Sequence, residues 1–127
     1  MIYRVLIGGS RNFKYYAYFK KCVDYYLYDL RILGEIVILS GHCAGTDLMT
    51  ERYAEENNYS LELFPAQWNK YGRSAGPIRN EIMVAKCDYV IAFWDGTSKG
   101  TKNLIDNAVK YNKPLRVKLI DTEKPPG

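Results

Sequence analysis

Short apolar runs alternate along the chain with segments whose apolar residues recur every three or four positions. The runs predict buried strands at residues 4–7, 36–39, 61–64, 89–93 and 115–120. The longer periodicity predicts helices at residues 16–33 and 46–56, a helix opened by Gly76-Pro77 with Ile78, Ile82 and Ala85 as its apolar line, and a helix that carries Leu104, Ile105, Ala108 and Val109. Residues 66–76 are polar and aromatic and are expected to be irregular.

Strands that alternate with helices indicate a parallel sheet covered by helices on both faces. A chain of 127 residues also fits one domain of common size. We therefore predict a single Rossmann-like, three-layer α/β/α domain with a mostly parallel sheet over residues 1–127. Such sheets bind ligands at the carboxyl ends of their strands, so the candidate chemistry should gather at one edge.

Three of the predicted strands end in small residues, at residues 8–11, 40–47 and 94–101. The last two loops run into helix N-termini, whose free N–H groups and dipole attract phosphate. Glycines after strands can also do no more than form tight turns, but three such loops at one edge favour an anion site. We expect residues 95–101 to be the main phosphate cradle, with Ser98 capping the helix that follows.

Four of the charged side chains in or near these loops are candidates for contact with a ligand. The guanidinium groups of Arg11 and Arg79 suit phosphate or carboxylate, although either arginine could instead form a surface salt bridge. Asp47 can accept a hydrogen bond from a ribose hydroxyl, or it can simply stabilise its helix from a position in the first turn. Lys99 can help to neutralise the charge of a phosphate. The candidate ligand-binding residues are Gly9, Ser10, Arg11, Gly41, His42, Gly45, Thr46, Asp47, Trp68, Arg79, Asn80, Trp94, Gly96, Ser98, Lys99, Gly100 and Thr101.

Aromatic residues have two expected roles. Trp68 and Trp94 could stack on a base or ribose, or belong to the core. Four tyrosines in or beside the first helix fall off its apolar line, and tyrosine is favoured at interfaces, so we expect a homo-oligomer, most simply a homodimer. These tyrosines are Tyr15, Tyr18, Tyr25 and Tyr28.

Composition narrows the classes of function. A net charge of +4 suits an anionic small ligand, but the basic residues are dispersed, which argues against nucleic acid as a partner. Neither an apolar run of membrane-spanning length nor a signal-peptide layout is present, so we expect a cytoplasmic protein without a membrane partner. Three cysteines without paired spacing give no disulfide framework or metal motif, and no cofactor is expected.

Two long motifs carry a resemblance to a known family. Residues 64–83, FPAQWNKYGRSAGPIRNEIM, and residues 92–101, AFWDGTSKGT, together with Gly9-Ser10-Arg11, closely resemble the YspA/YpsA-related SLOG family. The resemblance implies a Rossmann-like fold and the binding of nucleotide-derived ligands. It would make this chain a protein that senses, carries or sequesters an ADP-ribose-type or cyclic nucleotide signal, for example a phage or mobile-element protein that removes a host immune nucleotide.

The wider superfamily includes phosphoribohydrolases, which suggest an alternative function as a nucleotide N-glycosidase. Arg79 and Gly100-Thr101 match the pattern of these enzymes, but their catalytic glutamate falls on Leu104, or on Asn103 if the alignment shifts by one. Neither side chain can act as an acid or base, so binding without catalysis is the leading interpretation.

The second loop departs from the pattern of nearer relatives, which usually read Gly-Gly-Ala-basic-Gly-Ala-Asp. In this chain His42 replaces a glycine and Ala44 replaces the basic residue, while Gln67 stands where an aspartate is usual. We expect the fold to survive these changes and the ligand preference to differ.

Overall fold

The strands lie where the apolar runs predict them. The computed structural model describes residues 1–126, and its strands are β1 (Ile2–Gly9), β2 (Glu35–Ser40), β3 (Ser60–Leu63), β4 (Tyr89–Trp94) and β5 (Leu115–Leu119). β1 extends past the predicted apolar run because Gly8 and Gly9 continue to pair with Ala92 and Phe93 of β4. This extension carries the end of β1 to the edge where the loops meet.

The helices are α1 (Tyr16–Leu33), α2 (Thr46–Glu56), α3 (Trp68–Tyr71), α4 (Ala75–Lys86) and α5 (Lys99–Lys110). The bounds of α1 and α2 confirm the sequence prediction. The expectation of an irregular segment at residues 66–76 was wrong, because this segment holds α3, a 3-10 turn (Gly72–Ser74) and the start of α4. Pro77 is the third residue of α4, still within the first turn, where a missing N–H costs no helical hydrogen bond.

The predicted apolar line of α4 was also wrong. Ile82 is 45% exposed, and the buried side chains of the helix include Asn80, Met83 and Val84. Asn80 is buried because its amide donates to the Gly100 carbonyl, at 3.3 Å, and to Asn103 Oδ1, at 3.0 Å. A count of apolar residues misses a buried asparagine that bonds to a neighbouring helix.

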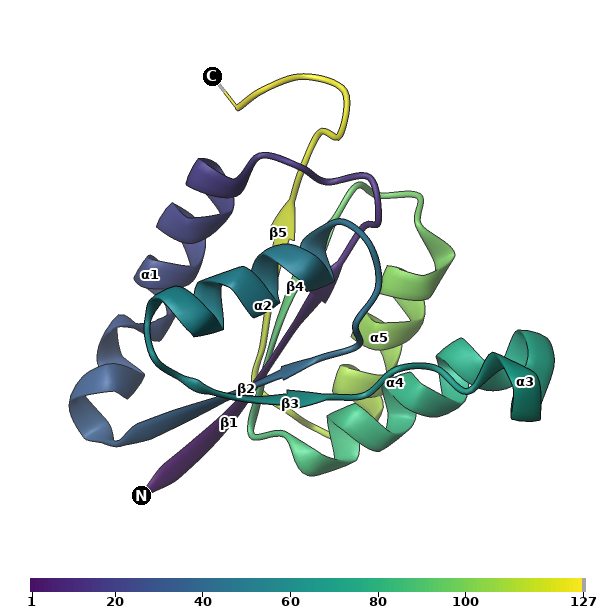
Figure 1. The fold of residues 1–127 in the computed structure, drawn as a ribbon, viewed down its shortest axis with the longest axis horizontal. Coiled ribbons are helices and arrows are strands. Elements are labelled where there is room, and N and C mark those ends of the chain that lie inside the picture. Colours follow the sequence, from purple (N-terminus) through teal and green to yellow (C-terminus); the bar gives the residue numbers. More distant parts are fainter. Residues whose placement is uncertain (127) are drawn as a thin grey trace.

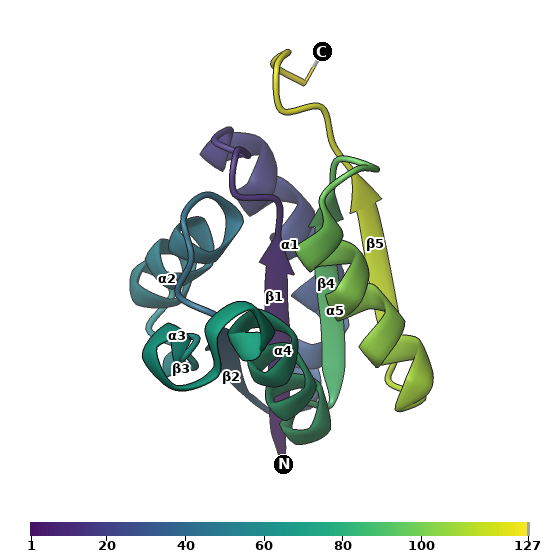
Figure 2. The same cartoon turned by 90° about the vertical axis from the view of Figure 1, so that its right-hand side faces the viewer.

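All the strands are parallel, in the order β3-β2-β1-β4-β5. α1 and α2 cover one face of the sheet and α4 and α5 cover the other (Figures 1 and 2). Consecutive strands run outward from β1 in one direction, and the chain then returns to place β4 on the other side of β1. Ligands of doubly wound folds bind at this reversal, beyond the carboxyl ends of the strands.

Each face of the sheet has its own apolar core. Phe19, Tyr53 and Phe93 are fully buried on the side of α1 and α2, whereas Leu39 and Val84 are fully buried on the side of α4 and α5. Burial of this kind contributes about 1.5–3 kcal/mol for each large apolar side chain and fixes the strand ends in place. The loops at the carboxyl edge are therefore held by two packed layers.

The tyrosines of the first helix do not act as one surface. Tyr15 and Tyr18 pack partly buried against the core, so they are not the free interface residues that the sequence indicated. Tyr25 and Tyr28 remain 79% and 66% exposed. No helix within residues 1–126 combines the length and apolar character needed to cross a membrane.

Candidate functional site

A pocket of about 510 Å³ opens at the carboxyl ends of β1 and β4, which is within the usual size range for small-molecule sites. It lies where the chain reverses its direction across the sheet. Most of the candidate residues from the sequence line it. These are Gly9, Arg11, Asp47, Trp68, Arg79, Asn80, Ser98, Lys99, Gly100 and Thr101.

The other candidate residues do not line the pocket, namely Ser10, Gly41, His42, Gly45, Thr46, Trp94 and Gly96. Several of them hold the loops together instead. The Thr46 hydroxyl donates to the Ser10 carbonyl at 2.9 Å, and Trp94 Nε1 donates to the Ser98 carbonyl at 3.1 Å. Gly45 has a positive φ of 73°, and a side chain there would collide with the Arg11 carbonyl, so its role is to let two loops approach.

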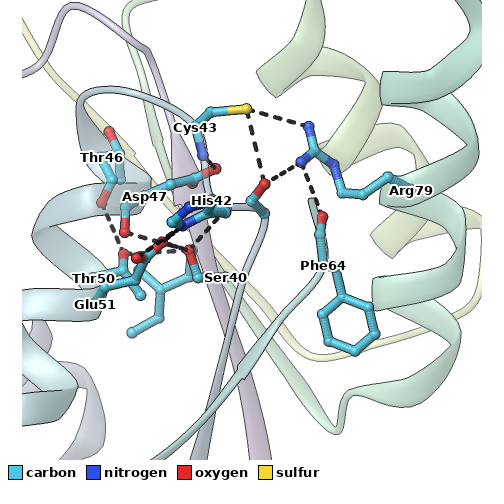
Figure 3. Close-up of polar contacts among 11 residues, drawn as sticks. Ser40, His42, Cys43, Thr46, Asp47, Thr50, Glu51, Phe64 and Arg79 are labelled. Carbon is cyan, nitrogen blue, oxygen red and sulfur yellow. Dashed lines mark hydrogen bonds and ion pairs between the residues drawn. The ribbon is translucent and has the colours of Figure 1, made fainter. Parts of the chain in front are cut away.

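His42 turns away from the pocket. Its Nδ1 lies 3.0 Å from the Glu51 carboxylate on α2 (Figure 3). Its φ of 60° lies in the left-handed region that favours glycine, which explains why a glycine is usual in relatives. The contact with Glu51 fixes the histidine outside the ligand space, so the substitution adds no bulk there.

Sequence reasoning missed several lining residues: Gly8, Asn12, Cys43, Gly76, Pro77, Met83, Asn103 and Leu104. Some of them could have been found by helical spacing. Met83 and Leu104 lie one turn beyond Arg79 and Gly100, on the same faces of their helices. Leu104, at the position of the glutamate in the phosphoribohydrolase pattern, is 4% exposed and gives this part of the pocket an apolar wall.

The N-terminus of α5 presents unpaired donors to the pocket. The first helical hydrogen bond of α5 runs from the Lys102 N–H to the Ser98 carbonyl. Among residues 1–126, the N–H groups of Lys99, Gly100 and Thr101 have no acceptor. The Thr101 hydroxyl also has no partner in this part of the chain, although the residue is only 5% exposed.

Ser98 does not cap α5 with its side chain, contrary to the sequence prediction. The Ser98 hydroxyl instead donates to the Asp95 carboxylate at 2.9 Å. The same carboxylate accepts the backbone N–H groups of Thr97, at 2.9 Å, and Ser98, at 2.7 Å. Burial opposes ionisation of Asp95, but the hydrogen bonds from Ser98 and Thr97 outweigh it and lower the pKa of Asp95 to about 2. The loop is therefore ordered from within, which leaves the next three N–H groups free.

Arg79 braces two loops. Its Nη1 donates to the carbonyls of Gly41 and Phe64 (Figure 3), and its Nε donates to Asn80 Oδ1 at 3.0 Å. Only Nη2, 3.6 Å from Cys43 Sγ, keeps donor capacity for a ligand. The guanidinium that the sequence offered as a phosphate clamp is thus mainly engaged with the protein.

Asp47 supplies the one acidic side chain among the described residues that line the pocket. It lies in the first turn of α2, is 7% exposed, and accepts the Cys43 N–H on Oδ2 at 3.1 Å. Burial raises the pKa of Asp47 to about 6, and the Cys43 N–H and the Arg79 guanidinium only partly offset this. Within residues 1–126, no group of His, Cys, Asp and Glu side chains is arranged to hold a metal ion.

Comparison with known proteins identifies the family. The model of the YspA, cpYpsA-related SLOG family matches residues 3–71. The chain is also 33% identical over 118 residues to the gene 61 protein of Mycobacterium phage D29, across 88% of this chain and 93% of that protein.

The chain belongs to the YspA, cpYpsA-related SLOG family. The chain shares its fold with DNA processing protein A from Helicobacter pylori, a protein whose structure explains how it binds single-stranded DNA. The TM-score is 0.64 with 22% sequence identity, over 96% of this chain and 67% of that chain. Similarity at this level of identity shows the fold alone.

Proposed function

We propose that the pocket binds a phosphate-bearing, nucleotide-derived ligand such as an ADP-ribose-type or cyclic nucleotide signal. The observation that carries the proposal is the set of unpaired N–H groups at Lys99, Gly100 and Thr101 beside an open pocket. Backbone donors at a helix N-terminus bind phosphate through hydrogen bonds and the helix dipole together. Thr101 lines the pocket, and its hydroxyl, without a partner in residues 1–126 and not among the buried unsatisfied atoms, supports the same interpretation.

Charge around this end of the pocket also favours an anion. Arg11 and Lys99 line the pocket, and the first turn of α5 contains no acidic residue. Cationic side chains beside free N–H groups make charge-assisted contacts that are stronger than neutral ones. Trp68, which is 48% exposed at the pocket, offers a surface on which a base can stack.

The ligand is bound rather than cleaved in this proposal. Leu104 and Asn103 cannot transfer protons, so nothing at this wall can act as the glutamate of the phosphoribohydrolase pattern does. The protein would sense, carry or sequester its ligand, and the 33% identical relative comes from a phage, the kind of source for which sequestration of a host immune nucleotide is proposed. N-glycosidase activity is the alternative, and the Asp47 carboxyl is the group in the pocket that could serve it.

The wild-type chain can be tested directly. Native mass spectrometry of the purified protein checks for a co-purified ligand, and calorimetry compares ADP-ribose, cyclic AMP and AMP with a short single-stranded oligodeoxynucleotide. We expect a nucleotide to bind and AMP to remain intact in a chromatographic assay for free adenine. Tighter binding of the oligonucleotide would favour the ligand class of the structural neighbour, and AMP cleavage that is lost in Asp47→Asn would favour the N-glycosidase.

The homo-oligomer remains a prediction that rests on a smaller surface than the sequence indicated. Tyr25, Tyr28 and Ile32 recur at helical spacing on α1 and are 79%, 66% and 72% exposed. Light scattering at micromolar concentration should give the mass of a dimer. If the wild type and Tyr25→Ser both have the mass of a monomer, the prediction of a homo-oligomer is wrong.

A further inference from the structure

We propose that Asp47 accepts a hydrogen bond from a sugar hydroxyl of the ligand, which makes the pocket selective for ribose over deoxyribose. This inference rests on the proposed function, because it assumes that a nucleotide-derived ligand places its phosphate at α5. It adds the chemistry of the opposite wall, where the α2 loop meets the end of β1.

The two carboxylate oxygens of Asp47 differ in their surroundings. Oδ2 accepts the Cys43 N–H (Figure 3) and lies on the side of Gly41, which does not line the pocket. Oδ1 lies 3.5 Å from the point that a Cβ on Gly8 would occupy, and Gly8 lines the pocket. Within residues 1–126, Oδ1 accepts no hydrogen bond, although the residue is only 7% exposed. No buried side-chain oxygen among the described residues lacks a partner, so Oδ1 is open to the pocket, where a hydroxyl of the ligand can donate to it.

No protein group nearby supplies this donor. The charged groups that face Asp47 are Arg79 from α4, Arg11 from the loop after β1, and Glu51 from α2. None of the ion pairs among the described residues includes Asp47, and Arg79 is engaged with the Gly41 and Phe64 carbonyls. Glu51 adds a further negative charge.

The donor must therefore come from a neutral part of the ligand. An ionised phosphate offers acceptor oxygens and no proton for Asp47 Oδ1, whereas a hydroxyl donates to a carboxylate without added charge. With Oδ2 already engaged, one free oxygen suits a single donor better than the paired donors of a base edge.

The spacing within the pocket agrees with a sugar. A Cβ on Gly8 would lie 2.9 Å from Leu104 Cδ2 and 3.5 Å from Asp47 Oδ1, so both groups flank the same point. Leu104 comes three to five residues after Thr101, Gly100 and Lys99, so this point lies about 4.5–7.5 Å along α5 from the free N–H groups. In a nucleotide the sugar is joined directly to the phosphate and the base is farther away. The group next to the phosphate, at Asp47, is therefore the ribose.

Matched nucleotides test this assignment. Calorimetry with ADP, 2′-deoxy-ADP and 3′-deoxy-ADP is carried out on the wild-type chain, on Asp47→Asn, and on Asp106→Asn as a control with an exposed carboxylate on α5. We expect wild type and Asp106→Asn to prefer ADP to at least one deoxy analogue by about tenfold or more. In Asp47→Asn the preference should fall to near unity, mainly because ADP binds less tightly.

The outcomes separate this inference from the proposed function. Equal binding of ADP and both deoxy analogues by the wild type would overturn the assignment of Asp47 and leave the phosphate site standing. A preference that persists in folded Asp47→Asn would overturn it as well. Failure of all three nucleotides and of ADP-ribose to bind would reject the proposed function and this inference with it. The comparison on the wild type needs no variant, so it holds even if Asp47→Asn misfolds.

Discussion

The loop at residues 40–47 and the loop at residues 94–101 both follow a strand, contain glycines and run into a helix at the same edge of the sheet. In the first, the carboxylate of Asp47 lies within the opening turn of α2 and lines the pocket. In the second, Asp95 comes before α5 and its carboxylate is engaged by Thr97 and Ser98, while the opening turn has no acid. The two loops thus present opposite chemistry to one pocket.

The difference shows that glycine content alone does not define a phosphate site. A carboxylate in the first turn offsets the positive end of its own helix, so α2 is a poor site for an anion. An aspartate placed before the helix instead orders the loop and leaves the helical N–H groups of Lys99, Gly100 and Thr101 free. One wall donates to phosphate and the other accepts from a neutral donor, so the pocket suits a ligand that carries both.

The largest effect is expected from Gly100→Val, which breaks the donor wall. A Cβ on Gly100 would meet no atom within 4 Å, and the φ angle of Gly100 lies outside the left-handed region, so the variant should fold. Its side chain would occupy the space through which phosphate approaches the N–H groups, and nucleotide affinity should fall at least a hundredfold, or about 3 kcal/mol. Calorimetry paired with a thermal melt measures both quantities, and Gly100→Ala should give an intermediate loss. Wild-type affinity in a folded Gly100→Val would place the phosphate elsewhere.

Asp47→Asn tests the acceptor wall through stability. The pKa of Asp47 is about 6 in the folded chain against an ordinary 3.8, so the folded state holds the proton more tightly. As pH rises through that window, the wild type should lose up to about 3 kcal/mol of stability that the variant does not lose. Urea unfolding at pH 4 and pH 7 should show the variant gaining relative to wild type as pH rises, with Asp106→Asn as control. If the difference in unfolding free energy between the variant and the wild type does not change with pH, burial does not destabilise the ionised form of Asp47.

The two pocket arginines should separate binding from bracing. Arg11 is exposed, so Arg11→Ala should weaken nucleotide binding about tenfold and leave the melting temperature unchanged. Arg79→Ala should also destabilise the fold by about 2 kcal/mol, because it leaves the Gly41 and Phe64 carbonyls without their donor. Arg73→Ala removes an arginine that does not line the pocket and serves as the matched control. Equal effects of Arg11→Ala and Arg79→Ala on stability would contradict the division of roles.

Lys99→Ala should give the smallest effect, a few-fold loss of nucleotide affinity. The side chain is exposed, so solvent screens its charge. Lys102→Ala, one turn farther along α5 and paired with Asp106, is the control and should not change affinity. If the two variants lose affinity equally, the effect comes from net charge rather than from the pocket.

Sequence patterns predict the fold well because strand and helix periodicity depends on local spacing. They give the bounds of α1 and α2 and bring Arg11, Asp47 and Lys99 to one edge. They fail where a polar side chain has a tertiary partner. The burial of Asn80 depends on acceptors on α5, and the bracing role of Arg79 depends on two carbonyls from other loops. Such partners are known only once the elements are packed together.

The claim that phosphate binds the N-terminus of α5 can be tested most directly by an NMR titration of the ¹⁵N-labelled chain with ADP-ribose. The account predicts that the amide signals of Lys99, Gly100 and Thr101 show the largest shifts and move downfield as they gain an acceptor. The amides of His42 and Thr46, in the other loop, should move less. Saturable binding that leaves the three α5 amides in place and shifts the α2 loop instead would contradict the account.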